Sequence, residues 1–442
     1  MQILQIILAL SILILVHELG HFTFARIFGI RIDKFFLFFD AGGVKLFSTR
    51  SKWFLKLFPK AADWETEYGL GWLPLGGYCK VNGMIDESMD TDHLKQEPKP
   101  WEFRSKPAWQ RLFVMAGGVL FNFILGILLY SFILCRWGEA YLPADKHCLY
   151  VYDDSLADKM GFKTGDKIIA LDGKAPKDFM MMQLDMARDM VSKVTVQRGN
   201  ETLDIYIDQK YISDMLSTQL FEPAIPFIIT DVAEESDNVD AGLLEGDQIV
   251  AIDTTATPYV QDALPLLEQK SGQEIEVTVI RGESKLNIPL SVDSDGNIGV
   301  YIRYPHTERL QYSILESIPA GCVKAYDAIV GQIKDMRLVA KPSTGAYKQV
   351  RSVIGMTEVM PVQWNWAVFI NILAMISIIL GVMNLLPIPA LDGGHMIFTI
   401  YEMITRRKPS DNFMYAMQLI GMIIIFGLMF LACGNDILRL MH

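Results

Sequence analysis

The chain has 442 residues, of which 51% are hydrophobic and 21% are charged, and its formal net charge is −11. This balance excludes a disordered chain, and the acidic net charge makes nucleic acid an unexpected partner. A mean hydropathy of +0.25, together with long uncharged runs, indicates that part of the chain lies in a bilayer. The five cysteines are scattered and form no C-x-x-C pair, which indicates neither a disulfide framework nor a thiolate metal site.

The hydropathy pattern predicts four membrane-spanning helices. Apolar runs of about 20 residues, the length that crosses a bilayer, occur at residues 3–27, 112–135, 366–388 and 413–433. The first run lacks the basic leader and the cleavage site of a signal peptide, so we expect a retained helix. A polar insert long enough for two small domains separates the second span from the third.

The distribution of basic residues predicts the orientation of these spans. Lys and Arg are concentrated between spans one and two, and again in the short turn at residues 406–408 between spans three and four. Basic connections stay in the cytoplasm. We therefore expect the insert and both termini outside, in the periplasm of a bacterial inner membrane.

The insert carries a repeated sequence pattern. GFKTGDKIIALD at residues 161–172 returns as GLLEGDQIVAID at residues 242–253, and VTVQRG at 194–199 returns as VTVIRG at 277–282. This pattern resembles a tandem of PDZ domains of the bacterial protease type, which bind extended peptides as an added strand. A spacer or a steric plug built from two small sheets is the alternative.

Residues 307–360 alternate apolar and polar side chains at helical spacing. We expect amphipathic linker helices on the outer membrane surface. Exposed helices packed on the second repeated domain are the alternative.

The first span contains the motif His17-Glu18-Leu19-Gly20-His21. On a helix, positions i and i+4 share one face, so both imidazoles can bind one metal while Glu18 acts on a metal-bound water. Ionisable side chains are costly inside a bilayer, which favours a bound cation over a polar seam that pairs with other side chains. Imidazole ligands with an open position suit zinc best.

A catalytic zinc needs a third protein ligand, and the end of span three offers one. Pro387 and Pro389 break that helix, and two glycines follow Asp392, so this carboxylate can turn inward. We therefore predict Asp392 as the third ligand. His395 is a lower-ranked rival.

These motifs together resemble the site-2 protease family (peptidase M50), of the regulator-of-sigma-E type. The similarity rests on HELGH in the first span, NLLPIPALDGGH at residues 384–395, PLGGY at residues 74–78 and the PDZ-like pair. One departure is Gly118, where the family often has proline before the asparagine at position 122.

The resemblance implies a polytopic α-helical membrane protein with a membrane-associated β-hairpin region and two periplasmic PDZ domains of mixed α/β type. The expected parts are the first span at 1–30, the cytoplasmic or membrane-dipping hairpins at 31–107, the second span at 108–137, the PDZ domains at 138–215 and 216–306, the linker at 307–360, the third span at 361–392, and the fourth span with the C-terminus at 393–442.

The resemblance also implies a zinc-dependent intramembrane endopeptidase, with Glu18 as catalytic base. Its substrates would be single-span membrane proteins, such as anti-sigma factors already cut by a site-1 protease, or remnant signal peptides. Asn384 and the hairpin residues Gly76 and Gly77 are the expected contacts to the unwound substrate backbone; a helix cap at Asn384 and an ordinary cytoplasmic hairpin are the alternatives.

Two other functions remain compatible with the residues. One is a non-catalytic membrane scaffold that binds peptides through the PDZ-like pair. The other is a zinc hydrolase acting on a lipid or a prenylated protein. The intact metal motif disfavours the first, and the doubled peptide-binding pattern disfavours the second.

Overall fold

The computed structural model describes residues 1–84, 97–352 and 355–441, so the expected parts at 31–107, 307–360 and 393–442 each include residues outside the description. The chain forms two compact units. The first comprises Met1–Gly138, Gln311–Arg337 and Lys348–His442, and the second comprises Glu139–Leu310 and Leu338–Tyr347.

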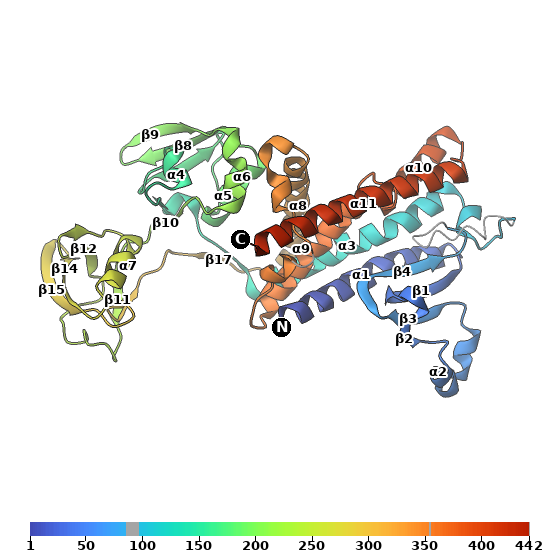
Figure 1. Ribbon diagram of the computed structural model, residues 1–442, viewed down its shortest axis with the longest axis horizontal. Helices are drawn as coiled ribbons and strands as arrows, with labels where there is room; N and C mark the ends of the chain where they lie inside the picture. The colour runs from blue at the N-terminus through green and yellow to red at the C-terminus, as the bar shows by residue number, and fades with distance from the viewer. Residues whose placement is uncertain (85–96, 353–354, 442) are drawn as a thin grey trace. The chain divides into compact units, whose positions relative to one another are not determined.

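Long apolar helices build the first unit (Figure 1). Among the described residues, four helices are long and apolar enough to cross a membrane, as the hydropathy pattern predicted. They are α1 (Gln2–Ile27), α3 (Ala108–Trp137), α9 (Trp366–Asn384) and α11 (Asp411–Leu440). Helix α3 packs against both α1 and α9, so it forms the centre of the unit.

The third span is shorter than its sequence predicted. Helix α9 ends at Asn384 rather than near residue 388, and a separate helix, α10 (Asp392–Thr405), precedes the last span. Proline has no N–H to continue the helical ladder, which explains a break around Pro387 and Pro389. Ala390 adopts a φ of 90° within this break. The expected short turn between spans three and four therefore contains a helix of its own.

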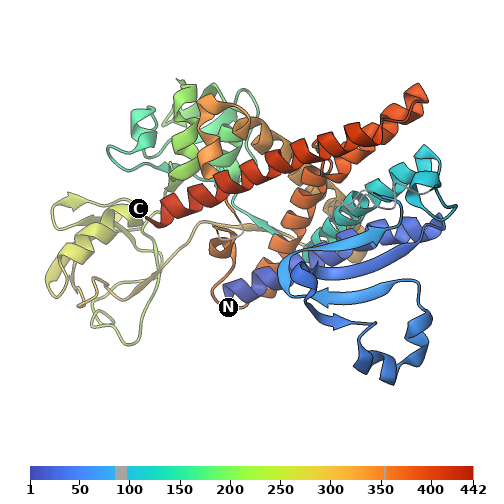
Figure 2. The ribbon, with the colours of Figure 1, turned by 45° about the vertical axis from the view of Figure 1, so that its right-hand side comes forward.

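A four-stranded sheet lies along α1 (Figure 2). Its strands are β1 (Ile32–Phe39), β2 (Lys45–Ser48), β3 (Glu67–Gly71) and β4 (Leu73–Val81), in the order β2-β3-β1-β4. The sequence predicted β-hairpins within residues 31–107. The strands do not form simple hairpins, because β1 lies between β3 and β4 and pairs in parallel with β3. Strand β4 is at the edge of the sheet and contacts α1.

The second unit contains both copies of the repeated pattern. The first copy forms β7 (Lys167–Leu171), α5 (Met182–Arg188), β8 (Lys193–Arg198) and β9 (Glu201–Tyr206). The second forms β12 (Gln248–Ile252), α7 (Val260–Gln269), β14 (Glu274–Arg281) and β15 (Ser284–Ser291). Both copies therefore run through a strand, a helix and an antiparallel hairpin, in the same order.

A matching ion pair stabilises each copy. Arg198 bonds the buried carboxylate of Asp166 at 2.7 Å, and Arg281 bonds that of Asp247 at 2.7 Å. Each guanidinium also donates to a glycine carbonyl, at Gly161 or at Gly242. The shorter elements of the unit are β5 (Glu139–Tyr141), β6 (Leu149–Tyr150), α4 (Leu156–Lys159), α6 (Ile212–Ser217), β10 (Glu222–Pro223), β11 (Ile229–Val232), β13 (Thr255–Ala256), β16 (Val300–Ile302) and β17 (Glu308–Leu310).

The expected amphipathic linker is mainly one long helix, α8 (Ile314–Val339), followed by 3-10 turns. In the first unit, Ala325 of α8 is buried against side chains of α3 and α9, and the backbone of Gly321 lies against Ser131 of α3. In the second unit, Leu338 and Ala346 complete the core of the first repeated domain.

Candidate metal centre

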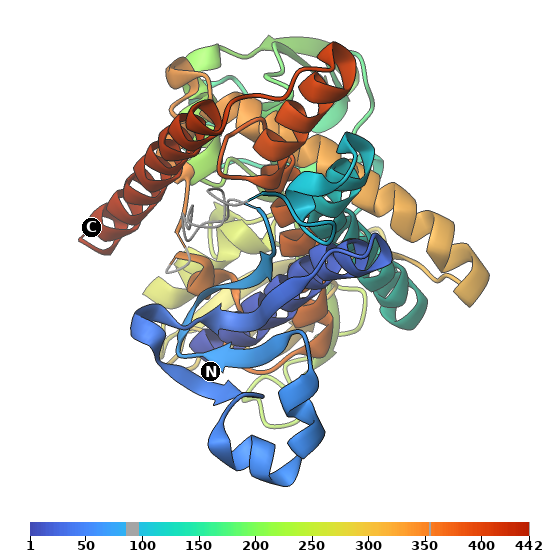
Figure 3. The ribbon, with the colours of Figure 1, turned by 90° about the vertical axis from the view of Figure 1, so that its right-hand side faces the viewer.

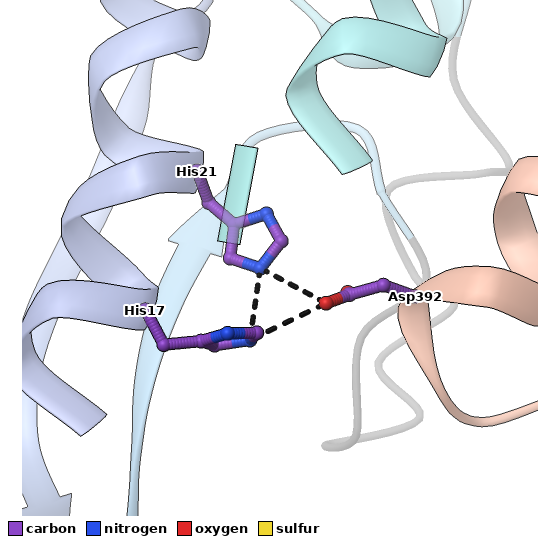
Figure 4. Close-up of side chains that lie close together, drawn as sticks. All are labelled: His17, His21 and Asp392. Carbon is purple, nitrogen blue, oxygen red and sulfur yellow. Dashed lines mark hydrogen bonds and ion pairs between the residues drawn. The ribbon is translucent and has the colours of Figure 1, made fainter. Parts of the chain in front are cut away.

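Three side chains of the first unit converge on one point (Figure 4). His17 and His21 lie one turn apart on α1, and their Nε2 atoms are 3.3 Å from each other. Asp392, the first residue of α10, places Oδ2 at 3.3 Å from Nε2 of His17 and at 3.5 Å from Nε2 of His21. The structure thus brings together the three residues that the sequence singled out as ligands.

The geometry of these three atoms fits a tetrahedral metal. Ligands held at about 2.0–2.1 Å from a tetrahedral zinc lie about 3.3–3.4 Å from one another, which matches the three observed separations. Oδ2 of Asp392 is buried and has no hydrogen-bond partner in the described part of the chain. Three lone pairs that face each other repel unless a cation lies between them, so the donor set suits a divalent metal with one open position.

Hydrogen bonds on the far side of each imidazole favour this arrangement. Nδ1 of His21 lies 2.8 Å from the carbonyl oxygen of Val114, which can only accept, so Nδ1 carries the proton and Nε2 is free. The fully buried side-chain amide of Asn122 places Nδ2 3.0 Å from Nδ1 of His17, and its Oδ1 has no partner among the described residues. Exchanging the amide nitrogen and oxygen, which have nearly the same shape, lets Oδ1 accept from Nδ1 and holds His17 in the same tautomer.

Glycines allow α3 to approach the two histidines. A Cβ atom on Gly118 would lie 2.5 Å from Nε2 of His21 and 2.6 Å from Cε1 of His17. Gly20 and Gly117 meet backbone to backbone at the same crossing, where a Cβ on Gly20 would be 2.2 Å from the carbonyl oxygen of Gly117. Only glycine fits at these positions, so the rings can rest directly on the α3 backbone.

The start and the end of α10 are both held in place. A Cβ atom on Gly393 or Gly394 would meet the carbonyl oxygen of Leu386 or Ile388 within 2.5 Å, so the two glycines permit the tight return from α9. Near the other end, Glu402 forms a largely buried ion pair with Arg111 of α3. These contacts fix the helix that presents Asp392.

A cavity of about 410 Å³ opens beside the three ligands. Glu18 lines this cavity, and so does Cys79 on β4. The segment from Gly77 to Val81 of the same strand forms another wall. Strand β4 is the edge strand of the sheet that the described residues form. A proton acceptor and this edge strand therefore lie next to the proposed metal position.

The remaining predicted residues lie at different places. The amide nitrogen of Asn384 is 3.5 Å from Nε2 of His17, which brings it to the site. Gly77 lines the cavity, whereas a Cβ on Gly76 would meet the ring of Phe39 instead. His395 lines the cavity but lies outside the cluster of His17, His21 and Asp392, as far as the described residues go.

The sequence analysis predicts no role for Asn122, although this residue is a polar side chain inside an apolar run. A buried amide needs a partner, and the imidazole of His17 is that partner. This signal could have placed Asn122 at the site.

Comparison with known proteins decides the family. The model of peptidase family M50 matches residues 5–428. The chain belongs to peptidase family M50. Its resemblance to the site-2 protease family is thereby confirmed, as is the expected enzyme class, a metalloendopeptidase.

Individual relatives cover nearly the full length. A regulator of sigma E protease from Haemophilus influenzae is 28% identical, with 98% of each chain covered. A regulator of sigma-E protease from Salmonella typhimurium is 26% identical over 98% of each chain. A Vibrio cholerae protein named as a zinc metalloprotease is 27% identical, again with 98% of each chain covered. Zinc, the metal expected from the sequence, is thus also the metal in that relative's name. The four apolar helices agree with a membrane protein.

Proposed function

We propose that this M50 peptidase is a zinc-dependent endopeptidase that cuts peptide bonds within the membrane. The observation that carries the proposal is the meeting of His17 and His21, inside the apolar helix α1, with Asp392 at the start of α10. Ionisable groups are rare in such segments and mark functional sites. The spacing of the three ligand atoms and the buried, unpartnered Oδ2 of Asp392 support zinc as their occupant.

Different residues of the chain have different roles in peptide hydrolysis. Zinc, when held by the three ligands, supplies a Lewis acid that polarises the substrate carbonyl and makes water acidic enough to attack at neutral pH. Glu18 accepts the proton of the attacking water at its carboxylate and delivers it to the leaving amine. Val114 and Asn122 hold the two imidazoles in the required tautomer.

The substrate must be unwound before it can be cut, because every backbone group of a transmembrane helix is internally bonded. We assign the freed backbone to β4, the edge strand beside the cavity, along which a substrate can be bound as an added strand. Gly77 keeps this strand close to α1, since a Cβ there would lie 2.6 Å from Ile14. We assign Asn384, at the end of α9, to the opposite side of the substrate backbone.

The substrate class follows from the relatives and from the insert. Two relatives are named as regulators of sigma E, which supports single-span anti-sigma factors, first shortened by a site-1 protease, as substrates; remnant signal peptides share the same architecture. We assign the second unit to the periplasm, as a pair of PDZ domains that exclude substrates with a large outer domain. The active site then lies towards the cytoplasmic face of the bacterial inner membrane.

Cleavage of a tagged single-span protein by the purified enzyme tests the proposal. We expect Glu18→Gln to lower the rate by about 10²- to 10⁴-fold while leaving the metal bound, and a chelator to abolish cleavage reversibly. A wild-type protein that contains zinc but cuts only a lipid or prenylated substrate would assign a different hydrolase activity. A protein without metal that cuts nothing would leave a peptide-binding scaffold as the better account.

A further inference from the structure

The excursion between β2 and β3 carries an exposed apolar surface that the proposed reaction does not use. It contains the short helix α2 (Lys52–Leu57) and a 3-10 turn (Pro59–Asp63). Figure 3 shows it extending from the sheet. We define the α2 patch as five apolar side chains that are at least half exposed: Trp53, Leu57 and Phe58 of this excursion, and Val44 and Leu46 just before and within β2.

The α2 patch is large for a surface that faces water. Trp53 is 60% exposed and Leu57 is 65% exposed, and on a helix these two positions share one face. Aromatic rings contact one another along the excursion, with Phe54 touching Trp53, Phe58 and Trp64. Contiguous exposed apolar surfaces of this kind mark contact with a partner or a membrane.

The excursion is tied to the end of the first spanning helix. Arg26, in the last turn of α1, bonds Glu65 at 2.7 Å. A chain of ring contacts continues from Phe22 of α1 through Tyr68 to Trp64. These contacts attach the excursion beside the last turn of α1, and Trp and Tyr side chains are enriched where a spanning helix leaves the apolar part of a bilayer.

The charged side chains of the excursion and of β2 before it are basic from Lys45 up to Ala62, and the acidic Asp63 and Glu65 follow. Lys45 pairs with Glu67, and Arg50 donates to the backbone carbonyls of Ala62 and Trp64, so these two act within the fold. The other three, Lys52, Lys56 and Lys60, are exposed.

The lysines and the apolar side chains occupy neighbouring faces. Lys52 and Lys56 are one helical turn apart, next to the face that Trp53 and Leu57 share. A short element with one apolar and one basic face lies flat in the interface of a membrane with anionic lipids.

We propose that the α2 patch is a membrane-surface anchor specific for anionic lipid. Trp53, Leu57 and Phe58 enter the boundary between headgroups and acyl chains, and Lys52, Lys56 and Lys60 contact the phosphates. The anchor holds β2 and β3, and through them the whole sheet, against the bilayer surface. It requires that the chain spans a membrane, but it does not depend on the metal or on catalysis.

Thiol accessibility in the full-length protein tests this anchor. Leu57→Cys and Asp63→Cys are compared in nanodiscs of phosphatidylcholine, with and without phosphatidylglycerol, using a water-soluble maleimide and peptide-level mass spectrometry. Asp63 is the matched control, because it is an exposed acidic residue of the same excursion. With phosphatidylglycerol we expect position 57 to react about 10-fold more slowly than position 63. Equal rates at both positions in both lipids overturn the proposal.

A second comparison tests the role of the lysines. Lys52→Gln, Lys56→Gln and Lys60→Gln are combined in the Leu57→Cys background, and the control combines Lys159→Gln, Lys174→Gln and Lys285→Gln in the second unit, where all three lysines are exposed. We expect only the first set to remove the effect of phosphatidylglycerol. Protection at position 57 that depends on neither phosphatidylglycerol nor these lysines assigns the patch to a protein contact and overturns the proposal. If the first set does not fold, the lipid titration of Leu57→Cys alone still decides.

Discussion

At the scale of single residues, Gly118 lies directly beneath the two imidazoles. Gly118→Ala would place a methyl group 2.5 Å from Nε2 of His21, so one ring must move away from the metal. We expect zinc affinity and cleavage to fall by about 10- to 100-fold, with the helices intact by circular dichroism. Gly427→Ala on α11 is the control, since nothing lies within 4 Å of a Cβ there. A Gly118→Ala enzyme with wild-type zinc affinity would refute the role of this contact.

Asn122 is the second residue whose replacement is informative. Asn122→Leu removes the amide that lies 3.0 Å from Nδ1 of His17, so the tautomer with a free Nε2 is no longer favoured. Replacing the hydrogen-bond partner of a metal-bound histidine typically lowers the metal affinity by about 10- to 100-fold. Ser377→Ala is a matched control, because Ser377 donates to the backbone oxygen of Asn122 and not to the ring. Chelator competition measures both variants; equal zinc affinities would show that the amide has no such role.

The sequence predicted the ligands at this scale because their spacing along α1, and the carboxylate after a helix break, are local features. It could not predict the neighbours from other elements. Val114 and Gly118 are ordinary residues of an apolar run, and they matter only because α3 crosses α1 at glycines. The alternation of side chains along β4 likewise turns Gly77 towards α1 and Gly76 towards Phe39, which the motif alone does not reveal.

At the scale of elements, the buried carboxylate of Asp247 joins the start of β12 to the end of β14. Hydrogen bonds from Arg281 hold the pKa of Asp247 below its usual value. A carboxyl group with a lowered folded-state pKa stabilises the fold above its unfolded pKa, near 4, and loses that contribution as the pH falls through the lower value.

This linkage predicts a pH-dependent effect of Arg281→Met. At pH 7 we expect the second repeated domain to lose roughly 1 kcal/mol of unfolding free energy, because the arginine is about one third exposed and partly screened. The difference from wild type should shrink as the pH falls below about 4. Pulse proteolysis of the full chain over a pH series measures it, and Arg309→Met, at an exposed arginine of β17, is the control. A difference that grows towards acid would have the wrong sign.

The break between α9 and α10 shows what element prediction could and could not provide. Pro387 and Pro389 identified the break correctly, but α10 was assigned to a short turn because its residues adjoin the fourth apolar run. The sheet was anticipated as hairpins because strands next to each other in sequence usually pair. Here β1 inserts between β3 and β4, which only long-range pairing decides.

At the scale of the whole molecule, the first and last strands of the large insert pair with each other. Strand β5 pairs antiparallel with β17, with Glu139 opposite Leu310. The chain therefore departs and returns at neighbouring points, so residues 139–310 can be replaced by a short flexible linker. Leu338→Ser should accompany the deletion, because this residue otherwise loses the core that buries it.

The exclusion role proposed for the insert predicts how this variant behaves. We expect it to bind zinc as the wild type does and to cut single-span substrates with and without a folded outer domain at similar rates. The full chain should strongly prefer the shortened substrate. The ratio of the two cleavage rates is the measurement. If the deletion leaves the wild-type preference unchanged, selection by size occurs elsewhere.

The division of the chain into apolar spans and a repeated insert could be predicted because it rests on composition and periodicity, which are properties of sequence alone. All four residues of the matching Asp166–Arg198 and Asp247–Arg281 bridges belong to the repeated pattern, but the pattern alone did not predict that they pair. The long helix α8 could not be placed in advance. Its small residues Gly321 and Ala325 pack against α3, and an amphipathic pattern does not name its partner.

The central claim is that His17, His21 and Asp392 hold one catalytic metal, and that Glu18 acts as the base without coordinating this metal. The zinc content of the purified full-length protein tests this claim most directly, with wild type compared with Asp392→Asn and Glu18→Gln. We predict about one zinc per chain in wild type and in Glu18→Gln, and loss of zinc from Asp392→Asn at the same chelator concentration. An Asp392→Asn protein that retains zinc as tightly as wild type would contradict the account.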